Sequence, residues 1–352
     1  MIIEIADRVL KDYRWYPLLD VIVDLAGRDG SRLAFSPSQI QNYISSPWLA
    51  GAVGSRGPIA EIIRGSLRAI SRAQISDAVI IRVDSIAPER GRTLDSNTIA
   101  IHPFGAINLI STPLHIIVED ETSDGAFILW MARYIGRDEI IRAYTSGRFI
   151  FRHAGGKGQF PKAASALSYG VWPREGRPIA AMKLRCGAVM DGDRRHPNHN
   201  PNGDLIEAVS QHVSFKYMLE CRTIENYVPQ KYFRRRLDQD GIGHLADEFF
   251  KLSEDQRRYF CLKGGYKNRD NIPRAQTLAE FSSDTNRPSE ERALFAAVDA
   301  ILWTKIGMGF GERLGSVFSS PVLRCDPGER SGLTPAQLIE VDAVLTDLVR
   351  HL

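Results

Sequence analysis

Two aspartates follow a mostly apolar run in the middle of the chain. Residues 184–190 have the pattern of a buried strand interrupted only by Arg185, and Asp191-Gly192-Asp193 follows directly. Aspartates at alternate positions of an extended chain project to the same side, and the intervening glycine lets a phosphate or a metal approach the backbone. Paired carboxylates at a strand end suit Mg²⁺ or Mn²⁺. Taken alone, the same tripeptide is also typical of an ordinary turn.

Further polar residues follow two earlier strand candidates. Glu119 comes directly after the apolar run 114–118, and a glycine-rich turn containing Lys157 follows the candidate strand 148–152. In a parallel sheet, functional residues gather at the carboxyl ends of the strands. If these strands are neighbours, Glu119 faces the two aspartates, and Lys157 is placed to contact a phosphate. Alternatively, the glycine-rich segment is an ordinary tight turn and the lysine is solvated.

The elements needed to position these residues are predicted from Pro113 onward, where strand and helix patterns alternate. Strands are expected over residues 114–118, 148–152, 184–190 and 215–219, with helices over 124–134, 159–169 and, in short form, 205–209. This alternation predicts a parallel sheet with right-handed crossovers, flanked by helices.

The chain divides into three predicted regions. Residues 1–112 form an N-terminal module of helices and strands without a catalytic signature, residues 113–230 the catalytic domain, and residues 231–352 a helical, locally basic region. Within the first region, helices are expected over 16–25, 40–44 and 59–70, and strands over 78–83, 98–101 and 106–110. Within the last, amphipathic helices are expected over 293–303 and 335–352. The predicted fold class is α/β.

The strand-end acids resemble the Toprim family, the metal-dependent catalytic domain of topoisomerases, primases and OLD-type nucleases. Its pattern is a glutamate closing the first strand, matched by Glu119, and an Asp-x-Asp closing a later one, matched by Asp191 and Asp193. The segment 155–158 resembles the glycine-rich turn of the nuclease-like branch. Residues 222–227, Arg-Thr-Ile-Glu-Asn-Tyr, resemble a segment of Toprim-like proteins in bacterial anti-phage systems. Asp120 stands where the family often has glycine.

The resemblance implies a Mg²⁺- or Mn²⁺-dependent nuclease that cleaves DNA or RNA, as an effector of phage defence. Asp191 and Asp193 would hold one metal ion, Glu119 would share a metal or act as general base, and Lys157 would contact a phosphate. Glu225 would complete a second metal site. Nucleic-acid backbone contacts are expected from Arg234, Arg235 and Arg236. Because the chain has no G-x-x-x-x-G-K-[S/T], an ATPase such as OLD-type nucleases use would be a partner subunit.

Other interpretations stay open for several of these residues. Glu225 could simply cap an element or pair with an arginine, and residues 234–236 could be a solvated helix face. His196 and His199 could bind a metal, but a mobile surface loop is expected. Tyr227 and Tyr232 could suggest a strand-passage nucleophile, but nothing distinguishes them from packing tyrosines.

Two other functions compete with the nuclease. One is a degenerate Toprim fold that serves as a binding or regulatory subunit, which Asp120 in place of glycine favours. The other is a phosphatase with Asp191 as nucleophile, which ranks low because the motif comes late in the chain and Arg194-Arg195 follows it.

Composition narrows the class of protein. The 352 residues are 43% apolar and 25% charged, with a net charge of only +3, so any nucleic-acid surface must come from local clustering of cations. The four cysteines form no C-x-x-C pair, which favours a reducing cytoplasm over a zinc site or disulfides. The first residues do not have the pattern of a signal peptide, and no apolar run approaches the ~20 residues of a membrane span. The sequence leaves the oligomeric state open.

Overall fold

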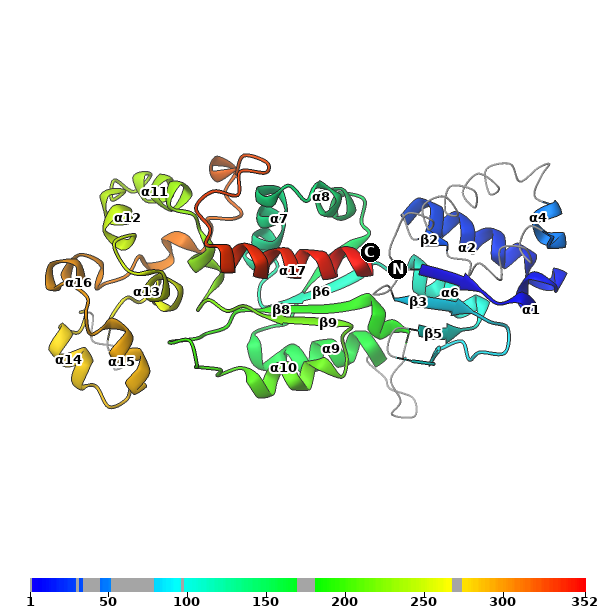
Figure 1. Cartoon of the computed structure of the whole chain (residues 1–352), viewed down its shortest axis with the longest axis horizontal. Helices are drawn as coiled ribbons and strands as arrows, with labels where there is room; N and C mark the ends of the chain where they lie inside the picture. The colour runs from blue at the N-terminus through cyan, green and yellow to red at the C-terminus, as the bar shows by residue number, and fades with distance from the viewer. Residues whose placement is uncertain are drawn as a thin grey trace.

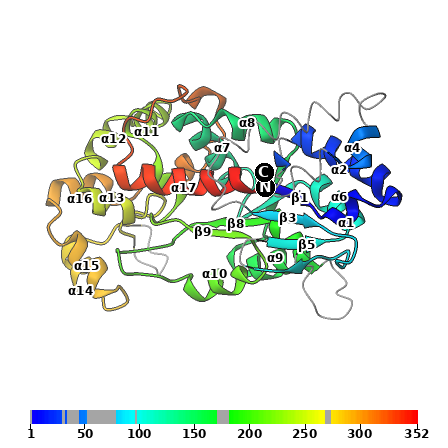
Figure 2. The same cartoon turned by 45° about the vertical axis from the view of Figure 1, so that its right-hand side comes forward.

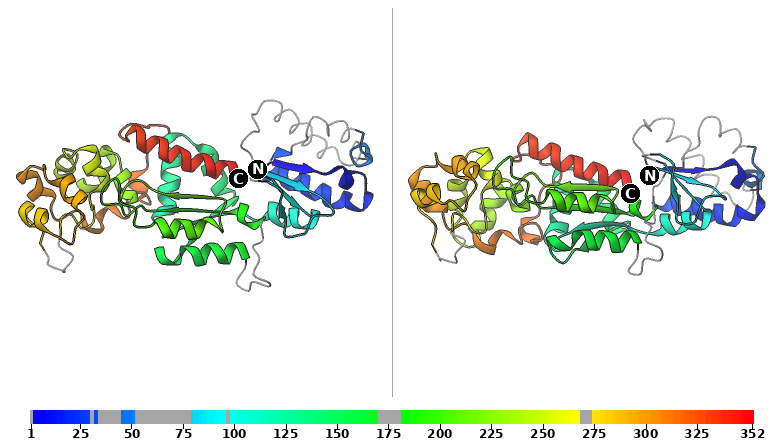
Figure 3. Two further views of the ribbon diagram at one scale, coloured as in Figure 1. Left: turned by 60° about the horizontal axis from the view of Figure 1, so that its bottom comes forward. Right: turned by 90° about the horizontal axis from the view of Figure 1, so that it is seen from below.

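The computed structural model describes residues 2–29, 32–33, 45–51, 79–95, 98–169, 181–267 and 274–352. Three parts follow one another along the longest axis: an N-terminal sheet with its helices, a middle sheet covered on both faces, and a helical region (Figures 1, 2 and 3). The start of the first strand and the end of the last helix lie side by side between the two sheets. The predicted α/β class with parallel sheets flanked by helices is confirmed.

The N-terminal sheet has five strands in the order β2-β1-β3-β5-β4. They are β1 (Ile2–Ile5), β2 (Arg32–Leu33), β3 (Ile80–Val83), β4 (Arg92–Thr93) and β5 (Thr98–Ile101). All pairs are parallel except β4 with β5. The described helical segments of this part are α1 (Asp7–Leu10), η1 (Tyr13–Trp15), α2 (Tyr16–Asp29), α4 (Pro47–Gly51) and α6 (Pro103–Ser111). The helices predicted over 40–44 and 59–70 lie outside the described residues.

The predicted strand over 106–110 is wrong, because these residues belong to helix α6. The His102 side chain accepts a hydrogen bond from the Phe104 N–H and Pro103 occupies the first turn, so the helix start is well defined. Ala106, Leu109 and Ile110 are buried in the N-terminal core. A short apolar run that is buried does not distinguish a strand from a helix by periodicity.

The middle sheet has four parallel strands in the order β7-β6-β8-β9. They are β6 (Leu114–Val118), β7 (Phe149–His153), β8 (Cys186–Met190) and β9 (Phe215–Met218). Every residue of β6 and β8 is buried, as expected for central strands of a sheet covered on both faces. The four predicted strands of this region are therefore present: the boundaries of β6 are as predicted, and those of the other three differ by one or two residues.

Helices cover both faces of this sheet (Figure 1). On one face lie α7 (Asp124–Ile135), α8 (Asp138–Thr145) and α17 (Pro335–His351), and on the other α9 (Phe160–Tyr169) and α10 (Gly203–Ser210). Helix α8 was not predicted. Short 3₁₀ turns η2 (Lys157–Gln159), η3 (Met182–Arg185) and η4 (Ile224–Tyr227) flank the strands. Helix α17 packs against α7 and α8, so the end of the chain returns to the middle sheet.

The remaining helices form the C-terminal helical region. They are α11 (Gln230–Asp238), α12 (His244–Phe249), α13 (Glu254–Tyr259), α14 (Leu278–Ser283), α15 (Ser289–Phe295) and α16 (Ala300–Ile306), with η5 (Gly311–Leu314) and η6 (Pro321–Leu323). The single helix predicted over 293–303 is wrong, because helix α15 ends at Phe295 and a second helix, α16, begins at Ala300. Asp299 caps α16 by accepting hydrogen bonds from the Ile301 and Leu302 N–H groups. In the described part of the chain, no helix combines the length and apolarity needed to cross a membrane.

Candidate functional site

The strand order brings the predicted acids to one edge of the middle sheet. The chain passes from β6 to β7 on one side and then returns to β8 on the other side of β6, so β6 and β8 are the neighbours at which the strand order reverses. In sheets of this kind, ligands bind outside the carboxyl ends of the strands at this reversal. Glu119 follows β6 and Asp191 follows β8, as the sequence predicted for neighbouring strands. These ends point toward the helical region (Figure 1).

The Asp191-Gly192-Asp193 segment is a turn as well as a strand end. Asp193 has a φ of 51°, so the chain leaves the extended conformation and the two aspartates do not simply alternate along a strand. The Asp193 N–H donates to Arg222 O at 2.8 Å, which joins this turn to the segment after β9. A Cβ on Gly192 would lie 2.2 Å from Leu219 O, so only glycine fits this close approach.

Lys157 lies between the acids of the two strands. Its ammonium group donates to Asp193 Oδ2 and lies 3.6 Å from Glu119 Oε2. Burial opposes its charge, but the hydrogen bond that Lys157 donates to Asp193 and the negative charges of Asp191, Asp193 and Glu119 outweigh burial and raise the Lys157 pKa. In this structure Lys157 therefore binds protein carboxylates, whereas the sequence-based expectation was a phosphate.

Asp120 closes the turn after β6. Its Oδ1 accepts from the Thr122 N–H at 2.7 Å and from the Ser123 N–H at 3.0 Å, and the hydrogen bond from the Thr122 hydroxyl lowers its pKa despite some burial. Its own N–H donates to Asp124 Oδ2 at 3.0 Å. Asp120 thus builds the turn that presents Asp124 at the start of α7.

Asp191 has the least compensated carboxylate of the cluster. The residue is half-buried, yet its Oδ1 is sealed from solvent and has no hydrogen-bond partner within the described chain. Burial raises the Asp191 pKa well above its usual value; Asp124, Glu225 and Asp193 add to this, and Lys157 opposes it. Burial and the charge of Glu119 likewise raise the pKa of Asp124 to about 6, against the hydrogen bond from Asp120. An unsatisfied buried acceptor costs about 1–3 kcal/mol, so it marks a place for a donor or a cation.

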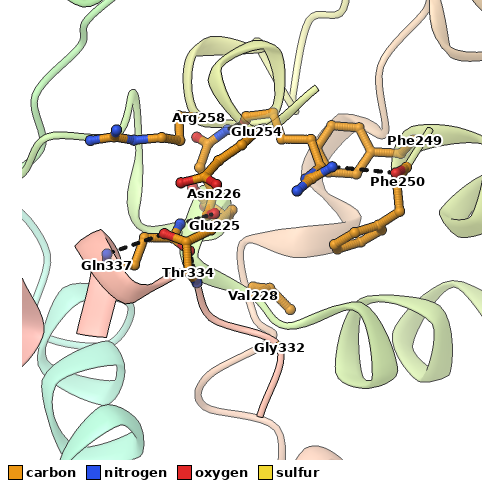
Figure 4. A pocket seen from close by; sticks show the side chains of 11 residues that line it. Glu225, Asn226, Val228, Phe249, Phe250, Glu254, Arg258, Gly332, Thr334 and Gln337 are labelled. Carbon is orange, nitrogen blue, oxygen red and sulfur yellow. Dashed lines mark hydrogen bonds between the residues drawn. The ribbon is translucent and has the colours of Figure 1, made fainter. Parts of the chain in front are cut away.

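Glu225 lies in η4, after β9. It lines a cavity of about 30 Å³ between η4, α12, α13 and the start of α17, together with Glu254 and Arg258 (Figure 4). Gln337 of α17 donates to Asn226 O at 3.1 Å beside it. A space of this size holds little more than one water molecule. Glu225 therefore contributes its charge to the site, while the cavity beside it is too small for a nucleotide.

The other predicted residues have mostly structural contacts. Arg234 pairs with Asp247 at 3.0 Å and Arg236 with Asp240 at 3.1 Å, both within the helical region. The phenol groups of the buried Tyr227 and Tyr232 donate to Glu340 and Glu329. In the predicted surface loop, Pro197 and Asn198 are exposed, but His196 is buried and its ring lies 5.3 Å from that of His199.

The side chains at this edge are of the type that binds a divalent cation, but they are not arranged as a metal site. The candidate ligands are carboxylate oxygens, which Mg²⁺ and Mn²⁺ prefer, and one of them, Asp191 Oδ1, has no hydrogen-bond partner in the described chain. Nevertheless, in the described ranges no three His, Cys, Asp or Glu side chains are grouped so that they could hold a metal ion. Lys157 supplies the positive charge instead.

Two residues of this edge were absent from the predicted site. Asp124 affects Asp191 electrostatically, and the Asn202 side-chain amide donates to Asp191 O at 3.1 Å and to Asp193 Oδ2 at 3.2 Å. The sequence position of Asp124 could have indicated this, since an acid in the first turn of the helix after β6 must lie near the strand end. The sequence gives no such indication for Asn202, because its contact depends on the fold of the 194–202 loop.

Comparison of the chain with protein-family models, with curated proteins and with solved structures found no match.

Proposed function

We propose that this chain is a Mg²⁺- or Mn²⁺-dependent nuclease with a Toprim-like catalytic domain, as its strand-end motifs suggest. The observation that carries the proposal is the meeting of acids from β6 and β8 where the strand order reverses, beside the unpartnered Asp191 Oδ1. A phosphodiester is anionic, and this edge alone would repel it. A divalent ion, when bound, would neutralise phosphate charge and lower the pKa of an attacking water.

Each residue then has a defined task. Asp191 and Asp193 would hold the metal with Glu119, while Asn202 fixes the orientation of Asp193 through its hydrogen bond at 3.2 Å. Asp124 would add a further carboxylate from α7. Lys157 already lies within this group of acids, so its ammonium is placed to contact a phosphate brought to the same edge. An ATPase partner and a role in phage defence extend the proposal through the Toprim resemblance.

One observation favours a second function, a catalytically degenerate subunit. The contacts of Lys157 with Asp193 and Glu119 give the acidic edge an internal cation, and a site neutralised in this way has less need of a metal. Such a subunit would bind partners or nucleic acid without cleaving it. The two functions differ in whether Mn²⁺ binds in a manner that depends on Asp191.

The deciding experiment uses the full chain with Mn²⁺ or Mg²⁺ and labelled DNA and RNA. The nuclease predicts cleavage by the wild type, loss of cleavage and of calorimetric Mn²⁺ binding in Asp191→Asn, and no loss in the matched control Asp204→Asn on the exposed face of α10. Circular dichroism checks that both variants fold. Equal activity of the wild type and Asp191→Asn would reject the proposal, and Mn²⁺ binding absent from all three proteins would favour the degenerate subunit. Hydrolysis of a small phosphate ester without nucleic-acid cleavage would favour the phosphatase.

A further inference from the structure

Glu291 of α15 is a buried carboxylate on which three arginines from separate segments converge. Only 1% of the residue is exposed. Arg287 lies one helical turn before it, Arg195 comes from the loop after β8, and Arg222 from the segment after β9. Glu291 therefore lies where the helical region contacts the two loops that carry the candidate site.

Arg287 donates to one carboxylate oxygen of Glu291, while the other, Oε2, is buried without a hydrogen-bond partner in the described chain. Its Nη1 lies 3.0 Å from Glu291 Oε1, and its other donors bind Lys267 O at 2.9 Å and Gln276 Oε1 at 3.1 Å. Asp284 adds a second carboxylate 3.4 Å from Arg287. Each of the three guanidinium nitrogens thus donates one hydrogen bond inside the helical region.

Arg195 and Arg222, in contrast, form no hydrogen bond with Glu291, and with Arg287 they place three cations beside the two carboxylates of Glu291 and Asp284. The Nη1 atoms of Arg195 and Arg222 lie 3.7 and 3.9 Å from Glu291, beyond hydrogen-bond distance. In the described residues, the Arg222 guanidinium donates only to Tyr259 O, at 3.4 Å, and that of Arg195 donates no hydrogen bond. A guanidinium carries five N–H donors. Both side chains are held in place at 17% and 19% exposure, yet most of their donors are unused.

The position of these two arginines relates them to the candidate site. Arg195 is two residues beyond Asp193, and the Asp193 N–H donates to Arg222 O at 2.8 Å. Arg234 and Arg236, by comparison, are neutralised by aspartates of the helical region. Cations beside an acidic catalytic edge are what a polyanionic substrate needs in order to approach it.

We propose that Arg195 and Arg222 bind backbone phosphates of the nucleic-acid substrate, and that Glu291 holds them in position until a phosphate replaces it as their partner. This inference rests on the proposed nuclease function and assigns its substrate contacts. Arginine forms paired hydrogen bonds with phosphate oxygens, which would use the donors that Glu291 leaves free.

The test is binding of a fluorescein-labelled oligonucleotide, single- or double-stranded, to the full chain in EDTA, where cleavage cannot occur. Arg195→Gln and Arg222→Gln should each weaken binding roughly three- to tenfold and reduce the slope of log K against log salt by about one. Arg142→Gln, which removes the same charge from an exposed residue of α8, is the matched control and should bind like the wild type. Glu291→Gln should tighten binding, because it removes the competing carboxylate, whereas Glu290→Gln on the exposed side of α15 should not.

Several results would overturn the inference. These are unchanged binding in both arginine variants, a loss in Arg142→Gln as large as in Arg195→Gln, weaker binding by a folded Glu291→Gln, or no binding by the wild type. Inorganic phosphate that displaces the oligonucleotide at equal phosphate concentration would show a site for free phosphate and also reject a nucleic-acid contact. Cleavage is not part of this assay, so arginine-dependent binding without metal-dependent cleavage would reject the nuclease and leave the binding site in place.

Discussion

Lys157 donates a hydrogen bond to Asp193 across the carboxyl edge of the middle sheet, from the turn after β7 to the turn after β8. The same ammonium lies 3.6 Å from Glu119, after β6. One lysine thus links residues that follow three different strands. The acids are held near one another without a metal, and any divalent ion that binds them must compete with this cation.

Replacing Lys157 by methionine should therefore separate metal binding from stability. Without metal, Lys157→Met should lower the free energy of unfolding by about 1 kcal/mol, since partly exposed ion pairs contribute little more than that. Mn²⁺ should bind several-fold more tightly, because the competing ammonium is gone. Urea unfolding in EDTA and calorimetric Mn²⁺ titration measure the two effects. Lys162→Met, at an exposed position of α9, is the control. Weaker Mn²⁺ binding by Lys157→Met than by this control would show that the lysine assists the metal.

The central elements were predictable because their sequence patterns are local. The strands β6 and β8 are short apolar runs followed at once by acids, and burial on both faces of a parallel sheet requires such runs. The same rule failed for 106–110, because helix α6 also buries Ala106, Leu109 and Ile110 and so contains a short, mostly apolar run. The break between α15 and α16 depends on the cap at Asp299, which competes with an otherwise continuous apolar pattern.

The parts of the site that could not be predicted depend on contacts between distant segments. Nothing near Glu291 indicates that Arg195 and Arg222 converge on it, nearly 100 and 70 residues earlier in the chain. Similarly, the return of α17 to the middle sheet is not encoded in the amphipathic pattern of 335–352, which shows a buried face without its partner. Sequence patterns identified which strand ends carry acids; the tertiary fold decides which cations face them.

A methyl group at Gly192 should disrupt the turn between the two aspartates. The Cβ of Gly192→Ala would lie 2.2 Å from Leu219 O and 2.6 Å from Cys221 O, and because both are backbone atoms the turn itself must move. We expect a loss of about 1–3 kcal/mol in the free energy of unfolding, as for other overpacked sites, with loss of Asp191-dependent Mn²⁺ binding. Gly158→Ala, where a Cβ has no neighbour within 4 Å, should stay within about 0.5 kcal/mol of the wild type. Similar urea midpoints for the two variants would contradict the predicted clash.

The hydroxyl of Tyr227 should stabilise the contact between α17 and the segment after β9. It donates to Glu340 Oε2 at 2.6 Å and accepts from the Cys221 N–H at 3.2 Å, in a fully buried position. Tyr227→Phe leaves a buried carboxylate and a buried N–H without this partner, so unfolding should become easier by about 1–3 kcal/mol. Tyr144→Phe removes the same atom from a ring that is 41% exposed and should have little effect. Urea unfolding of both variants measures the difference, and equal losses would show that the network contributes nothing specific.

His115 of β6 should make the folded protein sensitive to mild acid. Burial, together with the positive charges of Arg152 and Arg185, lowers its pKa from 6.5 to about 4. Its Nδ1 accepts a hydrogen bond from Arg152 Nε at 3.0 Å, which requires the neutral ring. Between these two pKa values the unfolded chain binds a proton that the folded chain does not. The stability contributed by neutral His115 is therefore complete above pH 6.5 and is lost as the pH falls toward 4.

The variant His115→Gln should not show this loss of stability at low pH, because it lacks the imidazole ring that takes up the proton. From pH 7 to pH 4, the wild type should lose roughly 2 kcal/mol more than the variant, after allowance for solvent screening of the shift. Thermal unfolding across this range measures both proteins, and His153→Gln on the exposed end of β7 controls for the removal of a histidine. Parallel pH profiles for the wild type and His115→Gln would mean that the ring takes up a proton in the folded state as easily as in the unfolded one. In that case Arg152 must move away from Nδ1 on protonation, since two cations cannot share that hydrogen bond.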